Sequence, residues 1–176
     1  MKRTELRRRA RLRSKPPEPG KGTRQPLRTT RREAGFSRQV RLLVRARAAG
    51  SIGSPGEPED AHCEGCGIWL GRYGGQVHHR LARQAGGCKL AVVNSTANAL
   101  LLCGTPEDKS TCHGRATAMD KDTKLAGFVL EHGIDPALHD PRYASVMWHA
   151  LGGSGVTFWL GENGDYLYAA PEASAA

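Results

Sequence analysis

The sequence of 176 residues lacks any long hydrophobic run. A membrane-spanning helix needs about 20 consecutive apolar residues, and polar residues interrupt every stretch well before that length. The basic start, MKRTELRRRARLRSK, is not followed by the apolar run of a secretory signal, although an arginine-rich transit peptide has a similar composition. We therefore expect a cytoplasmic protein with no membrane partner.

Acidic and aromatic residues are scarce at the start of the chain. Residues 1–48 hold 17 basic residues but only 3 acidic ones, whereas residues 49–176 hold 9 basic and 14 acidic ones. Since residues 1–34 offer little to bury, they are predicted to be a disordered basic arm. Its expected partner is a polyanion such as DNA, and the alternative is a solubilising or host-interaction tail. No aromatic residue precedes Phe36, which argues against base stacking by the arm.

Apolar periodicity predicts the elements that follow the arm. From Phe36 to Ala48 apolar residues recur at helical spacing, which predicts a helix over 37–48 ended by Gly50. Further predicted elements are strands at 68–70 and up to His79, a buried strand or helix entry at 99–102, a helix at 113–130 and a hairpin around 161–164. This pattern predicts a small α+β protein with a domain over 35–142 and a short C-terminal extension over 143–176.

Cysteine is also rare, with five in the chain. A reducing compartment disfavours disulfides, and an odd number leaves one thiol over, for which Cys88 is the candidate. The other four form two pairs, Cys63-x2-Cys66 and Cys103-x8-Cys112. The wide second pair encloses a polar insert that can loop out, so all four thiolates can reach one tetrahedral ion. We predict a structural zinc site; a redox motif is the alternative for a single pair.

Histidines with a possible catalytic role lie between and beside the cysteine pairs. His78 and His79 are neighbours at the end of a predicted strand, and His113 directly follows the last cysteine of the two pairs. Neighbouring residues of a strand point to opposite faces, so one imidazole can bind a metal while the other faces water or substrate. Two imidazoles leave coordination positions open to water and phosphate oxygen, which is typical of a catalytic metal. Any single histidine could instead be a surface or core residue.

This ordered set of residues resembles the HNH endonucleases, whose catalytic unit is the ββα-metal (His-Me) finger. The segments VHHRLARQAGG, NSTANALLLCG and TCHG look like those of small HNH proteins encoded by tailed phages and prophages. The resemblance covers about residues 36–142. It implies a small zinc-stapled ββα-metal domain that hydrolyses DNA phosphodiester bonds, by nicking or by double-strand cleavage.

The resemblance also implies a role for each residue of the set. It makes His78 and His113 ligands of a catalytic divalent ion (Mg²⁺, Mn²⁺ or Ni²⁺) and His79 the general base. Asn98 takes the motif position at which relatives either anchor the loop that orients the base or contact the metal, and both roles stay open. Many relatives carry a further ligand where this chain has Thr117.

Basic residues near these motifs are candidates for contacts with DNA phosphates. Arg80 directly follows the expected base, although an arginine there could equally be a solvated strand end. The other candidates lie in the helix predicted over 37–48: Arg38, Arg41, Arg45 and Arg47.

Several functions remain open at this stage. If the chain is encoded by a phage, the resemblance implies work in the host cytoplasm beside terminase subunits in DNA packaging. A homing or restriction-type endonuclease is the alternative among enzymes. A non-catalytic zinc-binding DNA-binding module would explain the cysteines and the arm, but not the order of the histidines. An interaction protein with a decayed nuclease domain is the third possibility.

Overall fold

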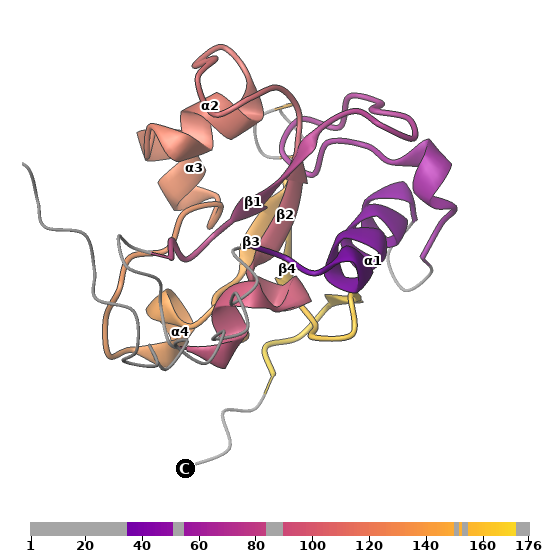
Figure 1. Ribbon diagram of the computed structural model, residues 1–176. Helices are drawn as coiled ribbons and strands as arrows, with labels where there is room; N and C mark the ends of the chain where they lie inside the picture. Colours follow the sequence, from indigo (N-terminus) through magenta and orange to yellow (C-terminus); the bar gives the residue numbers. More distant parts are fainter. Residues whose placement is uncertain (1–34, 51–54, 84–89, 150–151, 153–154, 172–176) are drawn as a thin grey trace, which may run out of the picture. The chain divides into compact units, whose positions relative to one another are not determined.

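The computed structural model of the protein describes residues 35–50, 55–83, 90–149, 152 and 155–171. The basic arm (1–34) and Cys88 lie outside the described residues. The helices are α1 (Arg38–Ala49), α2 (Cys112–Thr117), α3 (Lys121–Leu125) and α4 (Pro136–His139), with 3₁₀ turns η1 (Pro58–Asp60), η2 (Ala91–Asn94) and η3 (Thr96–Asn98). The strands are β1 (Gln76–His79), β2 (Ala99–Leu102), β3 (Val146–Trp148), β4 (Val156–Leu160) and β5 (Tyr166–Leu167) (Figure 1). This is a small mixed α+β domain, and none of its described helices is long and apolar enough to cross a bilayer.

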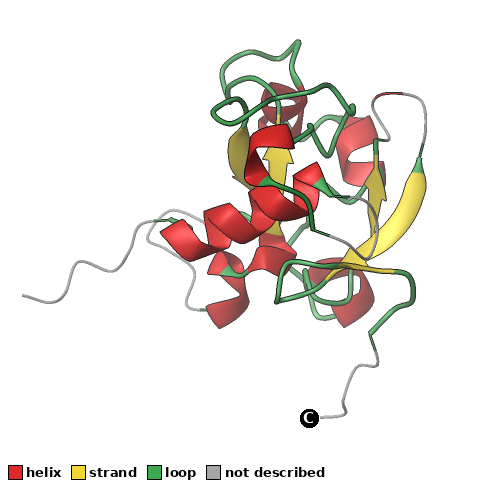
Figure 2. Cartoon of the chain, turned by 90° about the vertical axis from the view of Figure 1, so that its right-hand side faces the viewer, coloured by secondary structure: helices red, strands yellow, loops and turns green. Residues whose placement is uncertain are grey.

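Helix α1 matches the helix predicted from apolar periodicity. Ser37 caps its start, because the Ser37 hydroxyl accepts a hydrogen bond from the Val40 amide at 3.2 Å. Gly50 ends it and donates its amide to the carbonyls of Ala46 and Arg47. Helix α1 lies on the right-hand side of the molecule in Figure 1, which is the side that faces the viewer in Figure 2.

Strand β2 is the centre of the fold and pairs antiparallel with β1. All four residues of β2 are buried, because both faces of the strand are covered. Ala99 and Leu101 pack in a cluster with residues of α1, while Leu100 and Leu102 pack in a second cluster on the other face. Of the two alternatives predicted for residues 99–102, a buried strand or the entry to a helix, the buried strand is confirmed.

The C-terminal hairpin predicted around 161–164 is also confirmed. Strands β4 and β5 pair antiparallel, with Leu160 opposite Tyr166, and the unpredicted strand β3 adds a third member to their sheet. Four buried residues of these strands belong to the same core cluster as Leu100 of β2: Val146, Phe158, Leu160 and Tyr166. The expected C-terminal extension therefore shares its core with the residues before it.

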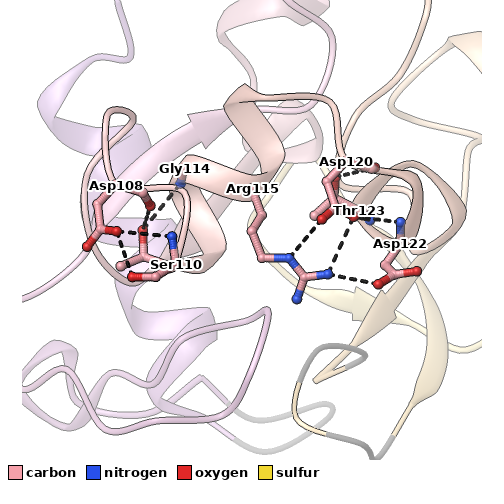
Figure 3. A network of polar contacts seen from close by, with 8 residues as sticks. Asp108, Ser110, Gly114, Arg115, Asp120, Asp122 and Thr123 are labelled. Atoms are coloured by element: carbon pink, nitrogen blue, oxygen red, sulfur yellow. Dashed lines mark hydrogen bonds and ion pairs between the residues drawn. The ribbon is translucent and has the colours of Figure 1, made fainter.

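The single helix predicted over 113–130 is wrong. Helix α2 ends early, and the chain turns at Met119, whose φ of 56° lies in the left-handed region. Asp120 then begins α3 as its N-cap, because the Asp120 side chain accepts hydrogen bonds from the amides of Asp122 and Thr123 (Figure 3). A local side-chain cap thus starts a new helix where apolar spacing favoured a continuous one.

The strand predicted over 68–70 is wrong as well. Only a single bridge forms there, between Trp69 and His62. Gly67 and Gly71 flank this bridge with φ values of 78° and 60°, so the chain turns on both sides of it.

A buried ion pair joins several of these elements. Arg47 of α1 forms two hydrogen bonds of 2.8 and 3.0 Å with the carboxylate of Glu64, and both side chains are only 1% exposed. The same carboxylate accepts the Leu101 amide of β2 and the Tyr166 hydroxyl of β5, each at 2.7 Å. With four donors the cost of burying the charge is offset, and α1, β2 and β5 are held around one group.

We expect Arg47→Met to lower the free energy of unfolding by about 3–5 kcal/mol, because it leaves the Glu64 carboxylate buried without its cation. Urea denaturation followed by circular dichroism measures this. Lys124→Met, which removes an exposed partner of Glu131, is the control and should change stability little. Equal losses in both variants would contradict the structural role of the buried pair.

Candidate functional site

Four cysteines come together at one point of the fold. Cys63 and Cys66 lie in the loop before β1, Cys103 follows β2, and Cys112 is the first residue of α2. Their sulfur atoms all lie within 4.8 Å of one another, and none is in a disulfide. The 3.8 Å between the sulfurs of Cys66 and Cys103 matches the edge of about 3.8 Å in a tetrahedron with Zn–S bonds of about 2.3 Å. The cluster could hold a metal ion such as zinc.

Short backbone hydrogen bonds shape the first pair of ligands. The Cys63 amide donates to the Ile68 carbonyl, and the Gly67 amide donates back to the Cys63 carbonyl, both at 2.8 Å. Gly67 has a φ of 78°, which permits this tight turn. The loop meets the end of β2 where the Cys103 amide donates to the sulfur of Cys63 at 3.2 Å.

The polar insert of the second pair loops out, as its composition predicted. Figure 3 shows the Asp108 carboxylate accepting hydrogen bonds from the amide and the hydroxyl of Ser110. Thr111 caps α2 by accepting the Gly114 amide. A Cβ atom at Gly114 would lie 1.9 Å from the Asp108 carbonyl oxygen, so this close approach requires glycine.

The thiols of the cluster influence one another's protonation. Donation from the Cys112 thiol lowers the pKa of Cys63 to about 5 and raises the pKa of Cys112, while burial raises the pKa of Cys66 to about 11. The Cys63 thiolate is therefore stabilised by its neighbours, whereas Cys66 and Cys112 need a bound cation to lose their protons near neutral pH.

The two neighbouring histidines face opposite sides of β1, as strand geometry predicted. The His79 ring stacks on Phe36, just before α1, with centroids 3.8 Å apart. The His78 ring instead lies edge-on to the ring of His113 on α2, at 5.2 Å. A cavity of about 310 Å³ is lined by all three histidines together with Thr117 and Arg83.

Burial keeps the three histidines neutral. Desolvation lowers the pKa of His78 to about 3 and also lowers the pKa values of His79 and His113. The Nε2 atom of His78 and the Nδ1 atom of His113 are buried without a hydrogen-bond partner. A neutral imidazole with a free nitrogen can bind a metal or accept a proton. Within the described part of the chain, however, three or more metal-ligating side chains come together only at the four cysteines.

Asn98 anchors the turn that follows β1. Its side chain is fully buried, accepts the Leu81 amide at 2.6 Å, and donates to the carbonyls of Leu81 and Val93 at 3.0 and 2.9 Å. All these partners are backbone groups. Of the two roles that the resemblance left open, the described contacts are those of a loop anchor.

The contact between Asn94 and His79 was not predicted from the sequence. The Oδ1 atom of Asn94 lies 3.3 Å from Nε2 of His79. Spacing along the chain singled out Asn98, which fits the motif, and carried no signal for Asn94. The contact arises because η2 packs back toward the end of β1.

Arg80 does not contact solvent, and its predicted DNA contact is wrong. The side chain is fully buried, and its guanidinium donates to five backbone carbonyls, those of Ala97, Gly127, Pro141, Ala144 and Ser145. Burial lowers the pKa of Arg80 to about 9. The arginine fastens the end of β1 to the segments packed around it.

The arginines of α1 divide into two groups. The predicted DNA contact by Arg47 is wrong, because Glu64 holds it in the core. Arg45 is half-buried and donates to the carbonyls of Gly71 and Gly74, whereas Arg38 and Arg41 are exposed.

Comparisons of the chain with protein-family models, curated proteins and solved structures found no match. Any assignment of function therefore depends on the chemistry of the cysteine cluster and of the histidine cavity.

We expect purified protein to contain one zinc ion per chain, because binding at a site of this type contributes on the order of 10 kcal/mol to folding. Cys112→Ser should lose the ion, because it removes one of the four thiolates. Zinc affinity should fall as pH falls, since protons compete for the thiolates. Elemental analysis and a chelator titration between neutral and acidic pH measure both effects. Cys88→Ser is the control and should keep its zinc, because Cys88 belongs to neither cysteine pair of the sequence. A folded, reduced sample without metal would contradict the zinc site.

Proposed function

We propose that the protein is a metal-dependent endonuclease of the HNH type that hydrolyses DNA phosphodiester bonds. The observation that carries the proposal is the cavity lined by His78, His79 and His113. These residues lie on an antiparallel strand pair followed by a helix, in the order β1, β2, α2. The order and positions fit the ββα-metal unit that the sequence resembles.

In this proposal His78 and His113 hold a divalent ion such as Mg²⁺, Mn²⁺ or Ni²⁺. Both are neutral and have a buried nitrogen without a partner, which suits a ligand. A bound ion of this kind stabilises negative charge on the phosphate and on the leaving oxygen. With only His78 and His113 to hold it, such an ion would keep its remaining positions open to water and phosphate oxygen.

His79 acts as the general base. If its Nε2–H donates to Asn94, Nδ1 carries no proton and can accept one from the attacking water. Stacking on Phe36 restrains the ring, and Asn98 holds the turn behind it. Arg83 lines the same cavity and supplies positive charge for a phosphate.

The four cysteines take a structural role in this proposal. A closed site of four thiolates leaves no position for substrate, and a zinc ion there joins the end of β2 to the start of α2. This holds the two strands and the helix that carry the histidines. DNA is the proposed partner, contacted by Arg38, Arg41 and the basic arm, and terminase subunits remain a prediction from the resemblance.

A non-catalytic zinc-binding DNA-binding module is the second candidate. Thr117 favours it, because this residue lines the cavity where many relatives carry a further ligand. Two imidazole ligands would hold a catalytic ion weakly, so the two candidates differ in whether added metal supports cleavage.

We expect His79→Ala to reduce plasmid nicking by about 100-fold or more while divalent ions still bind, because the base is lost but both ligands remain. His78→Ala and His113→Ala should instead weaken binding of the ion, with partial rescue by added Mn²⁺ or Ni²⁺. Calorimetric titration alongside nicking rates separates these effects. His132→Ala, an exposed histidine outside the cavity, is the control and should nick normally.

If His79→Ala loses the divalent ion while His78→Ala keeps it, the roles of metal ligand and general base are the reverse of those proposed for His78 and His79. Zinc content should stay unchanged in all of these variants, since the cysteine cluster is separate. Wild-type nicking by all three cavity variants would refute the nuclease proposal, and no nicking by the unsubstituted protein with any ion would favour the zinc module.

Asn94→Ala should slow nicking by about ten- to hundredfold, because the His79 ring loses the acceptor that orients it. Asn94→Asp keeps an oxygen acceptor and should restore most of the rate. Single-turnover nicking at saturating DNA measures the effect. Equal rates in Asn94→Ala and the unsubstituted protein would exclude Asn94 as a positioning residue.

A further inference from the structure

An exposed group of apolar side chains lies between the first cysteine pair and β1. We call residues 68–74 the aromatic loop, because it displays Trp69 and Tyr73, which are 64% and 86% exposed. Ile68 beside them is 58% exposed. Such a concentration of large apolar side chains in one short segment is typical of a contact surface.

The aromatic loop is held in a defined conformation despite its exposure. Arg45 of α1 donates to the carbonyls of both Gly71 and Gly74, and the Gly74 amide donates to the Leu70 carbonyl at 3.1 Å. The Trp69 ring lies against Gly71, where an added Cβ would come within 3.0 Å of the ring. The indole therefore packs on backbone and presents the rest of its surface to solvent, as a stacking platform requires.

Positive charge lines the path from this loop to the histidine cavity. Arg38, Arg41 and Arg45 recur at spacings of three and four residues and so share one side of α1. Arg41 donates to the carbonyl of Phe36, whose ring stacks on His79, while Arg45 binds the aromatic loop. Helix α1 thus spans about 10 Å between the base and the loop, which is a few nucleotides of one DNA strand. In Figure 1 the loop lies above the C-terminal end of α1.

Arg72 adds a second cation within the loop itself. Its guanidinium lies 5.6 Å from the centre of the Tyr73 ring, and the Arg72 side chain is 62% exposed. Glu59 pairs with it at 3.4 Å, an exposed contact that a phosphate can replace. Aromatic faces interleaved with arginines are the combination that binds single-stranded nucleic acid.

We propose that Trp69 and Tyr73 stack on unpaired bases of a DNA strand whose phosphates follow Arg38 and Arg41 toward the histidine cavity. In continuous duplex both faces of each base are covered by its neighbours, so an aromatic platform gains nothing from intact DNA. The substrate class is therefore DNA with unpaired bases a few nucleotides from the cut, such as a bubble, gap or flap. This inference rests on the proposed nuclease function, since it names the substrate of that site.

The test is binding of fluorescein-labelled DNA to the full chain carrying His79→Ala, which prevents cleavage during the measurement. Three probes are compared by anisotropy: a single strand, a duplex with a central bubble, and the fully paired duplex. We expect the bubble and the single strand to bind more tightly than the duplex. Adding Trp69→Ala or Tyr73→Ala should weaken bubble and single-strand binding by about tenfold, with less than about a twofold change for the duplex.

Matched variants separate stacking from general damage. Trp69→Phe keeps an aromatic face and should keep most of the affinity, and Leu125→Ala removes an equally exposed apolar side chain on α3 and should bind all probes normally. Tyr73 is 86% exposed, so Tyr73→Ala tests the inference even if a Trp69 variant fails to fold. If Tyr73→Ala and Trp69→Ala bind every probe as tightly as the His79→Ala parent does, the inference is overturned. A protein partner would then be the better explanation of the aromatic loop.

Failure of the nuclease proposal can be distinguished from failure of the stacking inference. If protein that retains His79 does not nick DNA, the nuclease proposal fails, whatever the binding data show. Bubble preference that depends on Trp69, without nicking, would leave a single-strand-binding zinc module. Normal nicking with no dependence of binding on the aromatic loop would leave a nuclease whose substrate is ordinary duplex.

Discussion

The Glu64 carboxylate is the contact at which separate parts of the fold meet. It lies inside the loop of the first cysteine pair and accepts hydrogen bonds from Arg47 of α1, the Leu101 amide of β2 and Tyr166 of β5. A buried carboxylate is costly unless every donor is in place, so the helix, the central strand, the cysteine loop and the C-terminal hairpin depend on one another. The same contact brings the first cysteine pair to the end of β2, where the second pair begins.

Arg80 has a corresponding role at the end of β1. Its five carbonyl partners come from η3, from the turn after α3 and from the segment before β3, so the residue next to His79 ties the end of β1 to distant parts of the chain. Asn98 fastens the same turn through Leu81. The histidines therefore project from a rigid strand end, which is what positioning a base or a ligand requires.

The two candidate centres differ in a way that suits different tasks. Four thiolates within 4.8 Å of one another would close the coordination sphere of a zinc ion, which suits a structural site. The cavity instead offers two neutral imidazoles with free nitrogens, a third held by Asn94 and stacking, and room for a phosphate. In the proposed enzyme the closed centre holds the elements together, and the open one carries the chemistry.

The features that depend on local pattern can be predicted from the sequence alone. Apolar spacing and the Ser37 cap define α1, residue alternation separates the faces of His78 and His79, and cysteine spacing predicts the cluster. Packing between distant segments sets three other features: which arginines are buried, the contact of Asn94 with His79, and the shared core of the C-terminal strands. Whether an arginine faces solvent or a ring of carbonyls depends on segments far away in the chain. Local periodicity does not reveal where those segments pack.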